Sequence, residues 1–156
     1  MTTFDFHDGN GLVPAHQHEN GGGWVANTAS VAETAFIGPN ASVYGNANVI
    51  GDAKVIDNAE VFDIAEVSGN AIVSGHAKVY ENAHVRDNAY VSDNANVRGY
   101  AMVRGNAEVF GNAIVFDKAD VGDQSLVMGI AELSGCAVVL GDANVSGNAK
   151  VSGNLE

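Results

Sequence analysis

The sequence predicts an all-β fold in which the chain coils repeatedly around one axis. An aliphatic residue recurs every six positions over residues 25–151, and all 22 positions hold Val except Ile37 and Leu133. Four residues after each aliphatic lies a second series with Ala at 20 of 22 positions, the exceptions being Ser125 and Leu155. Gly or Asp stands two residues after the aliphatic in 18 of the 22 repeats. A unit Val-x-(Gly/Asp)-Asn-Ala-x at a fixed period predicts a solenoid.

The geometry of this unit accounts for the coiling. Side chains alternate across a strand, so within Ala-x-Val-x the Ala and Val point to one side and both x residues to the other. The Gly-Asn or Asp-Asn pair that follows suits backbone with positive φ, which predicts a corner. A six-residue spacing gives no fixed apolar face on a helix, and strands this short pair poorly with their neighbours in sequence. We therefore expect each strand to pair with a strand of the next coil.

The chain divides into an N-terminal cap, residues 1–22, and a repeat domain, residues 23–156. The cap does not fit the repeat and contains four large apolar residues, Phe4, Phe6, Leu12 and Val13. We expect these residues to fold over the open end of the first coil and to cover its strand edges. The repeats end in Leu155-Glu156, a pair that the sequence leaves open as native or added residues.

The repeat resembles the hexapeptide-repeat, left-handed parallel β-helix superfamily over residues 25–156. The resemblance implies three hexads per coil, a triangular prism, residues 18 apart stacked above one another, and the left-handed sense of the coil. Seven such coils span ~35 Å at ~4.8 Å per strand. The segment Gly21-Gly22-Gly23-Trp24-Val25 is similar to the one preceding the repeats in bacterial and phage transferase-like proteins of this superfamily, which implies a phage origin.

The composition excludes several classes of protein. Apolar residues make up 46% of the 156 residues, so a core is expected, and a single cysteine rules out a disulfide framework. Nineteen acidic against seven basic residues give a net charge of −12, which disfavours direct binding to nucleic acid or to an anionic membrane. The sequence lacks a signal-peptide pattern and any apolar stretch of the ~18 residues that a membrane span needs. We expect a cytoplasmic protein.

On the expected prism, outward residues 18 apart form columns on three faces. One face carries the large apolar residues Trp24, Tyr44, Phe62, Tyr80, Ile114 and Phe116. A contiguous apolar patch on an acidic protein indicates an interface. Together with the trimers that the resemblance implies, the patch predicts a homotrimer whose interface comprises the last five of these residues. The alternative is that they reflect only the preference of aromatic residues for strands.

A second outward face brings cations together. Arg86 and Arg104 are stacked neighbours, ~5 Å apart by strand spacing, and Arg98 lies within the same coil's length. Stacked cations repel unless an anion or a carboxylate lies between them. The residues expected to bind a phosphate- or carboxylate-bearing small molecule are Arg86, Arg104, His84, Tyr90 and Arg98. The alternative is salt bridging to Asp87, Glu108 or a neighbouring subunit.

Catalytic and metal chemistry has little support in the sequence. His16 and His18 lie close together in the cap, but two ligands are fewer than the three or four of a usual metal site. We predict no metal and no cofactor. His84 is the only histidine expected on a flat coil face and the only candidate catalytic residue. Cys136 lies at a corner without a basic neighbour in its repeat.

These observations predict a non-catalytic β-helical assembly or binding protein that trimerises and holds an anionic small molecule between subunits. The resemblance implies an acyl-CoA-dependent acyltransferase as the alternative, but residues 25–156 run without the insertions that would shape an acyl-CoA site. A second alternative is an acidic rod that mimics DNA. Its net charge of −12 compares with ~20 phosphate charges over the same length of duplex.

Overall fold

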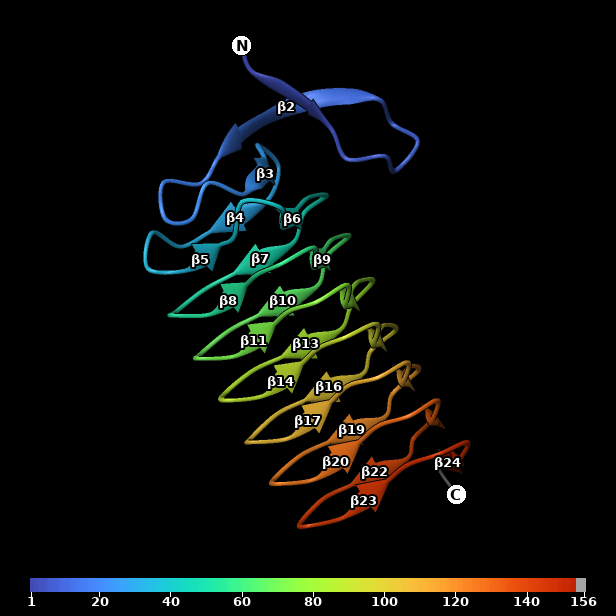
Figure 1. The fold of residues 1–156 in the computed structure, drawn as a ribbon. Helices are drawn as coiled ribbons and strands as arrows, with labels where there is room; N and C mark the ends of the chain where they lie inside the picture. Colours follow the sequence, from blue (N-terminus) through green and yellow to red (C-terminus); the bar gives the residue numbers. More distant parts are fainter. Residues whose placement is uncertain (154–156) are drawn as a thin grey trace.

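The computed structural model describes residues 1–153 and shows an all-β solenoid with three parallel sheets along its sides (Figure 1). Two sheets have seven strands and the third has ten, so the chain makes about seven coils, as the repeat predicts. Residues 154–156, which include Leu155 and Glu156, lie outside the described residues. Within residues 1–153, no helix is long and apolar enough to cross a membrane.

The strands are distributed over the three sheets in strict rotation after the cap. Sheet I contains β1 (Thr3–Asp5), β2 (Leu12–Gln17), β3 (Trp24–Ala26), β6 (Ser42–Val43), β9 (Glu60–Val61), β12 (Lys78–Val79), β15 (Asn96–Val97), β18 (Ile114–Val115), β21 (Glu132–Gly135) and β24 (Lys150–Gly153). Sheet II contains β4 (Ser30–Val31), β7 (Asn48–Val49), β10 (Glu66–Val67), β13 (His84–Val85), β16 (Met102–Val103), β19 (Asp120–Val121) and β22 (Val138–Val139). Sheet III contains β5 (Phe36–Ile37), β8 (Lys54–Val55), β11 (Ile72–Val73), β14 (Tyr90–Val91), β17 (Glu108–Val109), β20 (Leu126–Val127) and β23 (Asn144–Val145).

Parallel pairing between coils has the predicted register of 18 residues. In sheet II, His84 of β13 is the partner of Met102 of β16, and Val85 is the partner of Val103. The backbone N–H of His84 donates to the carbonyl oxygen of Ala101 at 2.9 Å. Each strand therefore obtains its hydrogen bonds from the next coil, which makes three hexads one turn.

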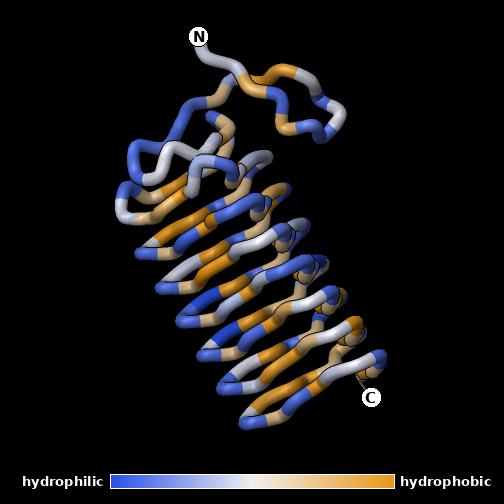
Figure 2. Tube along the Cα trace, in the orientation of Figure 1, coloured by the Kyte–Doolittle hydropathy of each residue, from blue (hydrophilic) through white to orange (hydrophobic). Residues whose placement is uncertain are grey.

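The core is a stack of two side-chain types. From Ile37 to Val139, every residue of the aliphatic series is at most 5% exposed, and the Ala series between Ala35 and Ala137 is as deeply buried. Figure 2 shows the same hydrophobic segments recurring in each coil, separated by hydrophilic corners. Ser125 replaces Ala and is fully buried, and its hydroxyl donates to the carbonyl oxygen of Gly122 at 2.7 Å. That hydrogen bond satisfies the polar group inside the core.

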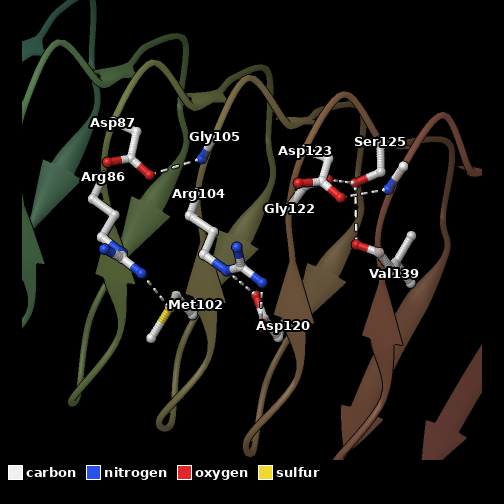
Figure 3. A network of polar contacts seen from close by, with 11 residues as sticks. Arg86, Asp87, Met102, Arg104, Gly105, Asp120, Gly122, Asp123, Ser125 and Val139 are labelled. Atoms are coloured by element: carbon white, nitrogen blue, oxygen red, sulfur yellow. Dashed lines mark hydrogen bonds and ion pairs between the residues drawn. The ribbon is translucent and has the colours of Figure 1, made fainter.

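The corners have the positive φ that the sequence predicts, and it falls on one residue of each pair. Positive φ occurs at the Gly or Asp of a corner, with 64° at Asp87 and 68° at Gly105, and not at the Asn that follows. The Asp87 carboxylate accepts a hydrogen bond from the backbone N–H of Gly105, one coil further on, at 3.0 Å (Figure 3). Every acidic residue at a positive-φ corner makes this contact: Asp57, Asp63, Glu81, Asp87, Asp93, Asp117 and Asp123. The hydrogen bond that the acidic side chain accepts from the next coil offsets the energetic cost of its positive-φ backbone.

The cap is a β-hairpin whose second strand extends sheet I. β1 pairs antiparallel with β2, and β2 pairs antiparallel with β3, so the cap covers the sheet I edge of the first coil, whereas β4 and β5 remain the terminal strands of sheets II and III. The aromatic residues differ from the prediction. Phe4 and Phe6 pack on the outward face of sheet I, and Leu12 is 71% exposed. The hairpin turns β1 back over that face, so its rings meet other outward aromatic side chains and not the open core.

Replacing Asp87 tests the role of the corner carboxylates. We expect Asp87→Ala to destabilise the protein by about 1–3 kcal/mol, because Ala keeps the positive-φ penalty and loses the hydrogen bond to the next coil. Asp87→Gly removes the backbone penalty and is expected to cost about 1 kcal/mol less than Asp87→Ala. Urea denaturation measures both, with Asp52→Ala at an exposed corner as the control. Equal stability of the Ala and Gly variants contradicts the interpretation.

Candidate functional site

Sheet I carries an outward column of stacked aromatic rings. Tyr44, Phe62 and Tyr80 each follow the Val of their strand and recur at intervals of 18. The ring centroids of Tyr44 and Phe62 are 4.9 Å apart and those of Phe62 and Tyr80 are 4.8 Å apart, with interplanar angles of 1° and 5°. Phe6 of the cap adds a ring 4.9 Å from Tyr44. The rings are therefore nearly parallel and stacked on one another along the sheet.

The column continues with Arg98 and Phe116. The guanidinium carbon of Arg98 lies 4.6 Å from the centroid of the Phe116 ring, which is a cation–π contact. Ile114 lies in the neighbouring column of the same sheet and is half-buried. Arg98 lies 18 residues after Tyr80 and therefore belongs to the aromatic column of sheet I, not with Arg86 and Arg104 on sheet II.

Exposure changes along this column. Tyr44 is only 6% exposed because Phe6 stacks on it, so the cap already covers this residue of the expected interface. The remaining residues are half-buried and are called the open column: Phe62, Tyr80, Arg98 and Phe116. All five residues expected at the interface lie on sheet I, and four of them remain accessible on its face.

Tyr44 is also tied to a charged pair. Its hydroxyl donates to the Glu60 carboxylate at 2.6 Å, and the Lys78 ammonium lies 3.1 Å from the other Glu60 oxygen. Burial, followed by this hydrogen bond to Glu60, raises the pKa of Tyr44 well above its ordinary value near 10. The tyrosine therefore stays protonated in the folded protein under conditions in which it ionises in the unfolded chain.

Arg86 and Arg104 lie in one column of sheet II, but they have different partners (Figure 3). Arg104 donates from Nε and Nη2 to the two carboxylate oxygens of Asp120 at 2.9 and 3.0 Å, and this pairing raises the pKa of Arg104. Arg86 donates to Met102 Sδ at 3.5 Å and makes no salt bridge within residues 1–153. The salt-bridge alternative thus applies to Arg104, with Asp120 as its partner in place of Asp87 or Glu108.

The Arg104–Asp120 contact belongs to a general diagonal pattern. Each contact joins two outward side chains on adjacent coils. The first residue directly follows a Val, and the second directly precedes the Val of the next coil, 16 positions later in the sequence. The pairs of this kind are Tyr44–Glu60, Ser74–Tyr90, Arg86–Met102 and Arg104–Asp120. The repeat predicts side-by-side placement only for residues 18 apart, so it does not indicate Asp120 as the partner of Arg104.

The other residues expected to bind an anion occupy all three sheets. Sheet II holds His84, Arg86 and Arg104. Nδ1 of His84 lies 3.9 Å from a carboxylate oxygen of Glu66, so an acidic residue flanks this histidine. Tyr90 lies on sheet III, where the Ser74 hydroxyl donates to its oxygen at 3.0 Å, and Arg98 lies on sheet I. A single chain does not bring Tyr90 or Arg98 to the cations of sheet II.

Within residues 1–153, no group of three or more His, Cys, Asp or Glu side chains is arranged to hold a metal ion. The two cap histidines have other partners. Nδ1 of His16 lies 2.8 Å from Asn27 Oδ1, and Nε2 of His18 lies 3.1 Å from the carbonyl oxygen of Ala32. Cys136 is a partly exposed free thiol.

Three hollows of the surface border the cap. One of about 490 Å³ lies between β1 and sheet I, and one of about 340 Å³ lies beside Phe6 and Pro14. The third, about 450 Å³, is lined by residues 16–19 with Val31 and Glu33. These three hollows are therefore all formed in part by the cap.

Comparison with known proteins adds no relative. No family model matches the chain, and neither the curated proteins nor the solved structures yield a match.

Raising the pH tests the environment of Tyr44. Above pH ~10 the unfolded chain releases the Tyr44 proton and the folded protein retains it, so this residue lowers the stability by up to about 1.4 kcal/mol per pH unit. Below that pH both states keep the proton and its contribution is constant. We expect Tyr44→Phe to lose less stability than the parent between pH 9 and 11 in urea denaturation. Parallel pH profiles for the two proteins contradict this expectation.

Proposed function

We propose that this protein is a non-catalytic β-helical assembly protein whose copies associate through the open column of sheet I. The observation that carries the proposal is the column itself, in which aromatic rings and an arginine align along one flat side of the rod and remain half-buried. Aromatic residues and arginine are enriched at protein interfaces and dominate their binding energy. Contiguous apolar surface of this kind marks an interaction site more often than scattered exposed residues do.

The regularity of the coils favours assembly over catalysis. Hexads follow one another without inserted loops, and the three hollows border the cap. The His84 side chain lies on a flat sheet and is 46% exposed. A catalyst needs a concave site that shields the reacting groups from water, and a flat sheet provides one only when another molecule covers it.

The finer parts of the proposal rest on the repeat and on composition. Membership of the hexapeptide-repeat superfamily, the left-handed sense of the coil and a homotrimer are proposed from the resemblance of the Val-x-(Gly/Asp)-Asn-Ala-x unit. Phage origin is proposed from the segment of residues 21–25, and a cytoplasmic location from the single cysteine, which fits a reducing compartment.

Charge reversal of the open column tests the assembly. We expect the parent protein to have three times the 16.0 kDa chain mass in size-exclusion chromatography with light scattering. The double variant Phe62→Asp, Tyr80→Asp places unpaired carboxylates in the interface and is expected to be monomeric. Circular dichroism checks that the variant stays folded.

The matched control alters a neighbouring pair on sheet III. Ile72 and Tyr90 are directly paired between β11 and β14, so Ile72→Asp with Tyr90→Asp adds the same charge to another face and is expected to leave the trimer intact. A monomeric parent protein, or a trimer that survives the sheet I variant, contradicts the assembly. Turnover of acetyl-CoA that disappears in His84→Ala contradicts the non-catalytic role.

A second candidate function is binding of an anionic small molecule on sheet II. Its support is the asymmetry between the two stacked arginines, because Asp120 neutralises Arg104 whereas Arg86 makes no salt bridge within the described residues. An anion placed beside Arg86 gains a charged hydrogen bond and relieves the repulsion between the guanidinium groups. His84 lies on the same sheet and adds a further donor.

Calorimetry with inorganic phosphate and AMP tests this site. We expect Arg86→Ala to weaken binding at least about 10-fold, the effect of losing one charged hydrogen bond, and raised salt to weaken it in the parent. Lys54→Ala is the control, because it removes an exposed cation from sheet III and is expected to have no effect if the site is confined to sheet II. The site is refuted if neither anion binds, or if Arg86→Ala binds as the parent does.

A further inference from the structure

In the second outward column of sheet I, the described coils place an aromatic ring only at Trp24, the first position of the column. Phe4 stacks on Trp24 with centroids 4.5 Å apart and an interplanar angle of 15°. The next residue of that column is Ser42, the partner of Trp24 in the pairing of β3 with β6, and Glu60 follows one coil later. In the adjacent column, the positions next to Ser42 and Glu60 hold the stacked rings of Tyr44 and Phe62. Because the Ser42 side chain is small, space is left next to the Trp24 indole. In the neighbouring column, the position beside Ser42 is filled by the ring of Tyr44.

The 490 Å³ hollow occupies this space. Trp24, Phe4 and Phe6 form its aromatic side, and Ser42 and Glu60 lie along the sheet. Two strand spacings, about 9.6 Å, separate Trp24 from Glu60, which is room for one six-membered ring stacked on the indole. The hollow is therefore large enough for one ring stacked on Trp24, and it extends toward the corner formed by residues 39–41.

Unused polar groups surround the same space. The Ser42 hydroxyl and the side-chain amides of Asn40 and Asn58 line the hollow, and none of them makes a hydrogen bond within residues 1–153. The Glu60 carboxylate, by contrast, already accepts from Tyr44 and pairs with Lys78. One hydroxyl and two amides supply both donors and acceptors around an aromatic wall.

We propose that this hollow binds a neutral saccharide, with one pyranose ring stacked on Trp24 above Ser42. A pyranose has an apolar face of C–H groups, which matches the indole, and a rim of hydroxyls, which matches the amides of Asn40 and Asn58. An anionic ligand is disfavoured by Asp5, Glu60 and the net charge of −12. A quaternary ammonium ligand is disfavoured because its cationic group offers no hydrogen-bond donor or acceptor to the Ser42 hydroxyl and the amides of Asn40 and Asn58.

The single tryptophan makes the site directly observable. Trp24 is the only tryptophan of the chain, so a change in intrinsic fluorescence reports on the hollow alone. We would titrate the full chain with glucose, galactose, mannose and N-acetylglucosamine and with their β-1,4-linked disaccharides, using choline and AMP for comparison. Saturable fluorescence changes with at least one neutral saccharide, confirmed by calorimetry, are expected.

Three variants locate the binding. Ser42→Phe supplies the missing ring and is expected to abolish saccharide binding while preserving the fold, because aromatic residues stack at this spacing in the adjacent column. Asn58→Ala is expected to weaken binding about 3- to 10-fold through loss of one hydrogen bond. Asn112→Ala changes an exposed asparagine at an equivalent corner three coils away and is expected to leave binding unchanged.

The outcomes separate cleanly. The proposal is overturned if no neutral saccharide gives a saturable signal up to about 50 mM, or if only choline or AMP binds. It is also overturned if Ser42→Phe folds and still binds, or if Asn58→Ala and Asn112→Ala behave alike. Should Ser42→Phe fail to fold, the comparison of the two asparagine variants decides.

Discussion

The backbone hydrogen bonds between residues 18 apart are the constraint on which the whole rod depends. Each strand is too short to be stable alone and obtains its partners from the coils on either side. These bonds place Val on Val and Ala on Ala, so every coil has the same cross-section. They also place each outward side chain above its equivalent. The aromatic column, the arginine pair and the corner carboxylates are therefore all consequences of one register.

The repeat made the architecture predictable because its information is local and strictly periodic. The six-residue alternation identified the buried residues, and Ser125, the one described exception in the Ala series, is accommodated by a hydrogen bond to Gly122. The corner was predicted less well. The sequence pattern did not distinguish which residue of a pair such as Asp87-Asn88 has positive φ, since both types tolerate it. The carboxylate contact with the next coil favours the aspartate.

The outward surface was only partly predictable, since long side chains reach beyond their own column. Arg104 bonds to Asp120 across a diagonal of 16 residues, and a search along 18-residue columns does not find such a partner. The cap was least predictable because it has no repeat. Its hairpin turns Phe6 onto Tyr44 and away from the core, which changes how much of the aromatic face remains accessible.

The interior and the exterior of this rod have different periods, and the difference bears on how such a chain changes in evolution. Inserting or deleting six residues preserves the core, because Val and Ala recur every six positions. The same event moves every later outward residue to the next sheet and breaks each column at that point. Only a gain or loss of 18 residues leaves both intact. The alignment of Tyr44, Phe62, Tyr80, Arg98 and Phe116 on one sheet thus implies that this stretch has changed in length only by whole coils since the column arose.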